Sequence, residues 1–319
     1  HMSKAKSMES ELRKRYDVDF LVSSLCNPLL IDVDYIMDGA TLTFEDGKLD
    51  IPTTFNNINA KKYLKDCLSL DLSKYDFIIN DHETLVASAS YIREYENIFT
   101  LSHQAAFRFK ETPRFELPWN RAHEKIPNDL VMRGYSTNKL ERCYGIHYKR
   151  YHERIFYPLL REEILNMNPT QNGKCVVYMP KLSKEQISSI LSSFKKQEFI
   201  VFDPKMTSLE EKHDNILFRK TDNKVFLENL EKCSMAIINA GFEMPSELMY
   251  LGKKFIAIPQ EAQYEQECNA LALSELGVKT YPYLTKEAVR NLLSDDTAIY
   301  GQPISSPAEI LDIIEKQVK

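Results

Sequence analysis

Short runs of apolar residues alternate along this chain with longer stretches in which apolar positions recur every three or four residues. In the second half, the apolar runs predict strands at 174–180, 198–204, 215–220, 234–242 and 254–260. The stretches that separate and follow them predict helices at 184–197, 224–233, 244–253 and 264–277. Strands separated by helices of this length predict a parallel sheet, and their continuous apolar character predicts that both of its faces are buried.

The first half follows the same alternation less regularly. It predicts helices at 3–16 and 84–95, and strands at 17–24, 75–83 and 98–103. Between the halves, residues 142–168 are rich in aromatic and basic side chains. We therefore expect two similar α/β modules, 1–155 and 156–304, and a C-terminal helix within 305–319 that packs back on the first module.

Composition narrows the class of protein. The chain has 319 residues, of which 43% are hydrophobic, enough for two domains with their own cores. Its 46 acidic residues outnumber 41 basic ones, which argues against a dedicated nucleic-acid binder. The six cysteines are scattered, which is typical of a reducing compartment, and no apolar run is long enough to cross a bilayer. We expect a cytoplasmic protein.

Several common catalytic motifs are absent. The sequence lacks G-x-G-x-x-G, the P-loop pattern, G-x-S-x-G and H-E-x-x-H, so a dinucleotide oxidoreductase, P-loop NTPase, α/β-hydrolase or zincin is disfavoured. His147 and His152 lie five residues apart and do not form one of the common metal-binding motifs, and the cysteines form no C-x-x-C pair. We therefore predict no metal site.

The segment 235–277 has the pattern of a phosphate site. A predicted strand ends in Asn239-Ala240-Gly241, and a helix follows within a few residues. Glycine lets a ligand approach the backbone, and the free N–H groups of a helix N-terminus attract a diphosphate. Glu247, expected in the first turn of that helix, has a carboxylate suited to a vicinal diol such as ribose. Further polar residues follow the next strand, and the carboxyl ends of strands are where ligands bind in such sheets.

The segment also resembles a known family. Its pattern NAGF-x-x-x-SE-x-x-x-x-GK, followed by IP, EQ and NA, resembles the donor-binding signature of GT-B glycosyltransferases. The similarity is to family 1 and to the enzyme that adds N-acetylglucosamine to lipid-linked muramoyl peptide. IINDHE (78–83) and SHQ (102–104) extend the resemblance to a group of bacterial and archaeal glycosyltransferase-like proteins. It covers about residues 3–277 and implies two facing Rossmann-like domains with parallel sheets.

The resemblance implies the activity. A sugar would pass from a nucleotide diphosphate, expected to be UDP, to an acceptor, with inversion and without a metal or other cofactor. Gly241 would contact the diphosphate, Glu247 the ribose, and Glu265 and Gln266 the sugar, while Arg219 and Lys220 would frame the base. The implied donor-binding set is Arg219, Lys220, Asn239, Ala240, Gly241, Phe242, Ser246, Glu247, Gln260, Glu265, Gln266 and Asn269.

The first module would then hold the acceptor and a general base. Asp81, Glu83 and His103 follow predicted strands, and we rank Asp81 first. The alternative is that Asp81 caps the next helix and His103 binds backbone.

Members of the group open with a glycine-rich strand and a turn ending G-H-x-S-R. His1-Met2-Ser3-Lys4 matches the end of that motif, so we expect the first strand to be missing from this sequence. If His1 is native, it is a further catalytic candidate.

Partners and rival functions follow from the same features. Residues 105–125, with basic residues at 149–154, interleave aromatic and basic side chains. We favour a loop that covers the sheet with buried aromatics; the alternatives are a lipid-phosphate acceptor or anionic membrane surface, which would make the protein peripheral, and single-stranded nucleic acid. Rival functions are a nucleotide-sugar hydrolase or epimerase, and a non-catalytic sugar-nucleotide-binding subunit.

Overall fold

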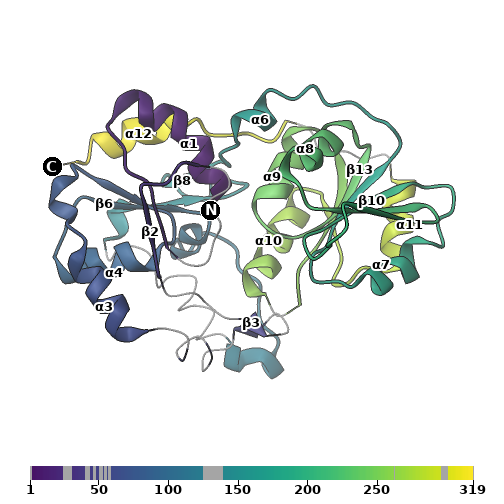
Figure 1. Cartoon of the computed structure of the whole chain (residues 1–319), viewed down its shortest axis with the longest axis horizontal. Helices are drawn as coiled ribbons and strands as arrows, with labels where there is room; N and C mark the ends of the chain where they lie inside the picture. Colours follow the sequence, from purple (N-terminus) through teal and green to yellow (C-terminus); the bar gives the residue numbers. More distant parts are fainter. Residues whose placement is uncertain are drawn as a thin grey trace. The chain divides into compact units, whose positions relative to one another are not determined.

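The computed structural model describes residues 2–23, 31–39, 44–45, 48–49, 53, 56, 59–124, 139–261, 263–295 and 301–318. The chain folds into two compact units (Figure 1). One is His1–Arg161 together with Ile304–Lys319, and the other is Glu162–Pro303. Each is described by itself.

The second unit is built on a seven-stranded sheet. Its strands are β9 (Cys175–Tyr178), β10 (Phe199–Asp203), β11 (Glu210–His213), β12 (Ile216–Lys220), β13 (Met235–Asn239), β14 (Lys254–Ile258) and β15 (Lys279–Thr280). Its helices are α6 (Glu162–Leu165), α7 (Lys184–Leu191), α8 (Asn223–Lys232), α9 (Glu243–Tyr250), α10 (Tyr264–Glu275) and α11 (Lys286–Ser294). The strands and helices predicted for this half of the chain are therefore confirmed, with shifts at their ends.

The strand order of this sheet is β11-β12-β10-β9-β13-β14-β15. All its pairings are parallel except the one between β11 and β12. If β11 at the edge is left out and the other six strands are numbered by their position in the chain, their order across the sheet is 3-2-1-4-5-6. This is the order of a Rossmann sheet. The order reverses between β9 and β13, and ligands bind such sheets outside the carboxyl ends of the strands at this switch point.

Helices cover both faces of the sheet (Figure 1). On one face, Ile187 and Leu191 of α7 join Val289 and Leu292 of α11 in one hydrophobic cluster, together with alternate residues of the strands. On the other face, Phe226 of α8 packs edge-on against a strand phenylalanine with ring centroids 5.0 Å apart. Because both faces are covered, the central strands β9, β10, β13 and β14 are largely apolar rather than alternating, as their sequences predict.

The helix ends explain the differences from prediction. The helix expected at 184–197 ends at Leu191, and the Ser192 hydroxyl donates to the Ser188 carbonyl at 2.7 Å, a local bond that competes with helix continuation. Gly252 and Gly277 have φ of 64° and 89°, a left-handed conformation that favours glycine after a helix. In both places the following amide bonds back into the helix, at 2.9 Å for Lys253 and 3.0 Å for Val278.

The first unit holds a four-stranded parallel sheet in the order β5-β6-β7-β8. The strands of the whole unit are β1 (Leu21–Ser23), β2 (Tyr35–Met37), β3 (Phe44–Glu45), β4 (Lys48–Leu49), β5 (Ile78–Asn80), β6 (Ile98–Ser102), β7 (Cys143–Ile146) and β8 (Ile155–Phe156). Of these, β1 pairs with β2 and β3 with β4 outside the four-stranded sheet. The helices are α1 (Met2–Arg15), α3 (Ala60–Ser69), α4 (Thr84–Ile92) and α12 (Pro307–Glu315), with short 3-10 turns η1 (Leu72–Lys74), η2 (Gln104–Arg108), η3 (Trp119–Glu124) and η4 (Leu140–Arg142).

Two strands lie where the sequence suggested only a connecting region. β7 and β8 fall inside 142–168, and they are too short for their periodicity to show. Gly145 in β7 is set against η2, because a Cβ there would lie 2.6 Å from the Ala106 Cα. Only glycine allows this approach, so β7 fixes the turn that follows β6.

Helix α12 lies beside α1 in the first unit (Figure 1). Its buried face carries Ile310, Leu311 and Ile314. At its exposed edge, Arg15 bonds Asp312 at 2.6 Å, and Arg150 pairs with Glu309 at 3.2 Å. In the described part of the chain, no helix has the length and apolar character needed to cross a bilayer.

Candidate functional site

The turn after β13 is the centre of the candidate site in the second unit. It lies at the switch point and leads into α9, which begins at Glu243. Apart from Gly241 itself and its two chain neighbours, no residue has an atom within 4 Å of the place where a Cβ of Gly241 would sit, so there is space for a ligand beside this backbone. An open backbone next to a helix N-terminus is suited to an anion such as a diphosphate.

Several predicted donor residues build this turn rather than face a ligand. The Asn269 side chain is buried and donates to the Ala240 carbonyl at 3.2 Å, which fixes α10 to the turn. The Asn239 amide donates to the Ile258 carbonyl at 3.1 Å and joins the ends of β13 and β14. The buried Ser246 hydroxyl donates to the carbonyl of Phe242, itself buried, at 2.8 Å.

The segment after β14 supplies a second group of predicted residues. The side-chain oxygen of Gln266 accepts from the backbone N–H of Gln260 at 2.9 Å. The side-chain NH₂ of Gln266 donates to the side-chain oxygen of Gln263 at 2.7 Å. Gln266 thus ties the start of α10 to the end of β14. Glu265 is the second residue of α10 and is partly exposed. Gln260 and Gln266 are partly exposed as well, so all three residues are accessible to a sugar.

Two carboxylates lie on one side of α9. Because the helix begins at Glu243, this residue and not Glu247 is the acid of the first turn, which corrects our expectation. Glu247 lies one turn further on and is only 4% exposed. Residues four apart share a helix face, so both acids belong to the same side.

Arg219 and Lys220 are not brought to this turn. They end β12, which is separated from β13 by β10 and β9, or roughly 14 Å at the usual strand spacing. The Arg219 guanidinium is already paired with Glu210 at 2.9 Å on the neighbouring β11. They are poorly placed to serve a diphosphate at Gly241.

Lys181 is a cation that the sequence reasoning overlooked. It follows β9, the strand next to β13, and its side chain is exposed. A signal was present, because Lys181 comes directly after the predicted strand 174–180. Only the strand order shows that this strand end, and not that of β12, is next to Gly241.

In the first unit, Asp81 follows β5 and is paired with a lysine. The ammonium of Lys4 in α1 lies 2.7 Å from an Asp81 carboxylate oxygen, and Lys4 is 2% exposed. The next residue, His82, has φ of 57°, which is uncommon for a residue other than glycine. Strain at a strand end is common where a site is held in one geometry.

Glu83 caps the N-terminus of α4, which is the alternative role that the sequence suggests for Asp81. Its carboxylate accepts from the amides of Leu85 at 2.8 Å and Val86 at 2.6 Å at the start of α4, and from the Ser23 hydroxyl. The Asn80 side chain accepts from the Glu83 amide at 2.7 Å. A carboxylate with these donors is committed to the helix terminus, which leaves Asp81 as the better candidate for a base.

The ends of β6 and β7 carry two buried histidines. His103 follows β6, and His147 follows the neighbouring β7. From the sequence, His147 is considered only as a possible metal ligand. Burial, and then the nearby His103, lower the pKa of His147 to about 4. The Lys149 amide donates to His147 Nδ1 at 3.4 Å, so the proton of the neutral ring lies on Nε2. His1 lies outside the described residues.

We expect His147 to make the protein acid-sensitive. Its pKa is about 4 in the fold against 6.5 ordinarily, so between these values the unfolded chain binds the extra proton. Stability present above pH 6.5 is then lost as the pH falls towards 4, by about 3 kcal/mol. Denaturant unfolding of His147→Gln between pH 4 and 7 should show a flatter pH dependence, whereas the exposed control His213→Gln should follow the parent. Parallel curves for the parent and His147→Gln would contradict the assignment.

The aromatic and basic segment 105–125 is buried at its start and more exposed further along, as far as the structure describes it. Phe107 and Phe109 are buried, and His152 stacks on Phe109 with ring centroids 4.4 Å apart. Phe115 is partly exposed, and Trp119 is 89% exposed. The two aromatics at the start of the segment thus belong to the core, whereas Trp119 does not.

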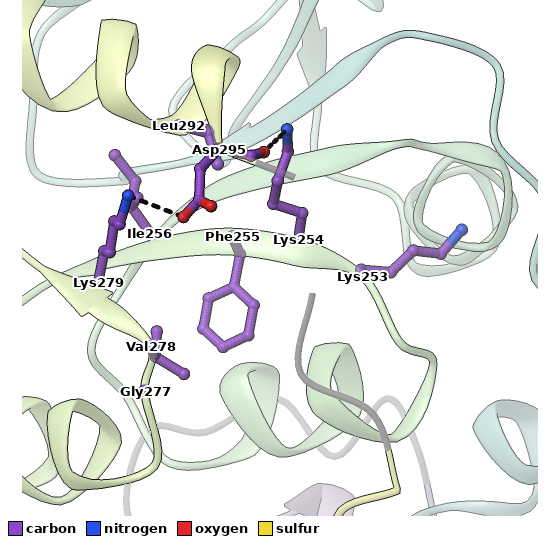
Figure 2. Close-up of a pocket in the computed structure, with 9 residues that line it drawn as sticks. All are labelled: Lys253, Lys254, Phe255, Ile256, Gly277, Val278, Lys279, Leu292 and Asp295. Carbon is purple, nitrogen blue, oxygen red and sulfur yellow. Dashed lines mark hydrogen bonds and ion pairs between the residues drawn. The ribbon is translucent and has the colours of Figure 1, made fainter. Parts of the chain in front are cut away.

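A small hollow lies at the opposite edge of the sheet in the second unit. It is lined by the first residues of β14 and β15, and Asp295 joins them by bonding Lys279 at 2.8 Å and Lys254 through its carbonyl (Figure 2). Its volume of about 10 Å³ is that of a single water. It is therefore no ligand site.

The candidate metal ligands of the described ranges are dispersed, and the cysteines there are buried. Among these residues, no three His, Cys, Asp or Glu side chains are grouped so that they could hold a metal ion. Five cysteines are buried thiols, and burial raises the pKa of Cys143 and Cys233 to about 11. Cys26 lies outside the described residues.

Comparisons with known proteins agree with this architecture. Spinosyn forosaminyltransferase SpnP matches 100% of this chain over 96% of its own length, with a TM-score of 0.59 at 13% identity. MurG of Acinetobacter baumannii matches 99% over 96%, with a TM-score of 0.57 at 13% identity. Arabidopsis thaliana UGT89C1 complexed with UDP matches 99% over 91%, with a TM-score of 0.55 at 13% identity.

These similarities show the fold, which is GT-B. No curated protein sequence matches the chain. The sequence profile of a family described as glycosyl transferase family 1 matches residues 54–295, which is most of the chain and includes parts of both units. The chain therefore belongs to glycosyl transferase family 1.

Proposed function

We propose that the protein transfers a sugar from a nucleotide diphosphate, with UDP as the nucleotide, to an acceptor hydroxyl. The observation that carries this proposal is the open Gly241 backbone at the switch point of a Rossmann-order sheet. The UDP in the UGT89C1 structure supports the choice of nucleotide.

The residues have separate roles in this proposal. The diphosphate binds the Gly241 backbone, with Lys181 neutralising its charge, and Glu247 accepts from the ribose hydroxyls. Glu265 binds the transferred sugar. The helix dipole and Lys181 then stabilise the leaving diphosphate, so the reaction needs no metal.

Asp81 in the first unit is the proposed general base. It takes the proton of the acceptor hydroxyl as that oxygen attacks the anomeric carbon, and the bond to the diphosphate breaks on the other side. A single displacement of this kind inverts the anomeric centre. The proposal specifies the acceptor only as a compound with a hydroxyl group. A lipid-linked acceptor would place the protein at a membrane surface.

Nucleotide binding tests the proposal. UDP and UDP-sugars should raise the melting temperature, because they bind the folded protein and not the unfolded one, whereas AMP should not. Glu247→Gln should weaken UDP binding by about tenfold or more, since a bond from a hydroxyl to a charged acceptor is lost. Glu228→Gln, an exposed residue of α8, is the matched control. Indifference of the parent protein to all nucleotides would overturn the proposal.

A further inference from the structure

Two neighbouring helices of the first unit expose apolar side chains. Leu64 and Leu68 of α3 are half-exposed, as is Ile92 at the end of α4, and Tyr91 is mostly exposed. Residues four apart lie on one face of a helix, so Leu64 and Leu68 form a stripe along α3. Single exposed leucines are ordinary, whereas a group of apolar side chains on adjacent elements marks an interaction surface.

The contacts between α3 and α4 bring these side chains together. The two helices lie side by side (Figure 1). Near their starts, the Tyr63 hydroxyl donates to the Thr84 carbonyl at 2.9 Å. Near their ends, Arg93 donates to the Leu68 carbonyl. The helices therefore run in the same direction, and the last turn of α4, with Ile92, lies beside Leu68.

Positive charge lies along the same helix. Lys61 and Lys65 of α3 are exposed, and neither forms an ion pair with another described residue. Lys62, the third lysine of the helix, is paired with Asp38. Asp66, the acid of the helix, is only partly exposed and interacts with Lys62. The exposed side of α3 thus combines two leucines with two lysines whose charge is not neutralised by a described neighbour.

This charge distinguishes between the possible occupants of the surface. A symmetric dimer brings the same patch of both copies together, so the lysines of α3 would face one another and repel. An anionic bilayer suits both kinds of side chain. Leucines enter the boundary of the acyl chains, while lysine stems extend past them and place the ammonium groups among the headgroups. Beyond α4, Arg93 and Glu94 offset one another and leave the sign unchanged.

We propose that this α3–α4 surface docks the protein on the anionic headgroups and outer acyl region of a lipid bilayer. The surface consists of Lys61, Leu64, Lys65, Leu68, Tyr91 and Ile92. Each lysine near an anionic leaflet adds to the attraction, and the apolar side chains add burial. The inference does not depend on the proposed function, because the surface needs neither a nucleotide nor an acceptor.

Sedimentation with lipid vesicles tests this docking. We expect the parent protein to bind vesicles that contain phosphatidylglycerol more tightly than vesicles of phosphatidylcholine alone, and to be released as salt is raised. The double variant Leu64→Gln/Leu68→Gln should weaken binding about tenfold, because apolar burial is lost. Lys61→Gln/Lys65→Gln should weaken it to a similar extent, because two attractive charges are lost.

Matched controls come from the second unit. Lys195→Gln/Lys196→Gln removes two exposed lysines, and Leu209→Gln replaces an exposed leucine. Both controls should bind like the parent. If they lose as much binding as the α3 variants, the attraction is general and the assignment of the surface is overturned. Failure of the parent to bind the anionic vesicles, or equal binding to both kinds of vesicle, overturns it as well.

Two further outcomes would assign the surfaces differently. Analytical ultracentrifugation without lipid reports on a second copy: a dimer that Leu64→Gln/Leu68→Gln dissociates, in a protein that binds no vesicles, makes the surface a dimer interface. Loss of vesicle binding in Trp119→Ala but not in the α3 variants moves the attachment to the segment 105–125. The lysine variant leaves apolar packing intact, so the test stands even where the leucine variant unfolds. Nucleotide binding, measured on the same proteins, reports on the proposed function alone.

Discussion

Replacing Lys253 by methionine is expected to lower the free energy of unfolding by about 3 kcal/mol. Lys253 is 2% exposed, yet its ammonium has a complete set of acceptors. It donates to the carbonyls of Thr170 at 2.6 Å, Glu231 at 2.6 Å and Cys233 at 2.8 Å. Methionine fills the same volume but removes this donor from all three carbonyls, of which that of Glu231 keeps a bond from the Thr170 amide at 2.9 Å.

The position of Lys253 explains why the effect should be large. Two of the carbonyls end α8, where a cation also offsets the negative end of the helix dipole, and the third belongs to the segment before β9. One side chain thus joins three parts of the second unit. Figure 2 shows it pointing away from the Lys254–Asp295 pair at the sheet edge.

Urea unfolding followed by circular dichroism measures this effect. The midpoint should fall clearly for Lys253→Met and stay unchanged for Lys232→Met, an exposed lysine at the end of α8. Burial lowers the pKa of Lys253 below its ordinary value, so the experiment is best run near neutral pH, where we expect the ammonium to be charged. Equal midpoints for both variants would show that the three bonds contribute nothing.

Asp81→Asn is expected to reduce turnover by about a hundredfold or more while nucleotide binding stays intact, because a general base contributes at least this much. UDP release from a bound UDP-sugar, with water as the acceptor, gives a rate without requiring the natural acceptor. Glu83→Gln should instead lower stability by about 1 kcal/mol with turnover preserved, because its carboxylate caps α4.

The ion pair with Lys4 must be separated from the role as a base. Asp81→Asn leaves a buried ammonium without its partner, which affects stability as well. Lys4→Met removes the same ion pair but keeps the carboxylate. If Asp81 is the base, Asp81→Asn loses far more turnover than Lys4→Met. Similar losses in both variants would show that only the ion pair matters.

Much of the second unit was readable from the sequence because its signals are local. Continuous apolar runs gave the strands, and amphipathic periods gave the helices between them. Gly252 and Gly277 lie at the ends of the predicted helices 244–253 and 264–277, and both adopt the left-handed conformation, which glycine does at low cost. The helix expected at 184–197 was too long, because a serine hydroxyl bonds back to the helix carbonyl there.

The first unit was harder to predict for a physical reason. β7 and β8 are four and two residues long, so they carry too few positions to show a period. Their pairing depends on β6 and on the contact between Gly145 and Ala106, which lie far apart in the sequence. His147 therefore looked like an isolated histidine until the sheet placed it next to His103.

By itself, the sequence determined the α/β alternation, the location of the turn at Gly241 and the resemblance to GT-B glycosyltransferases. Only the tertiary structure decided which residues can act there. It assigned Asn269 and Ser246 to the framework of the turn, separated Arg219 from it, and brought Lys181 to the adjacent strand end. The reason is that residue type and spacing are local, whereas strand order, burial and hydrogen-bond partners are set by contacts between distant parts of the chain.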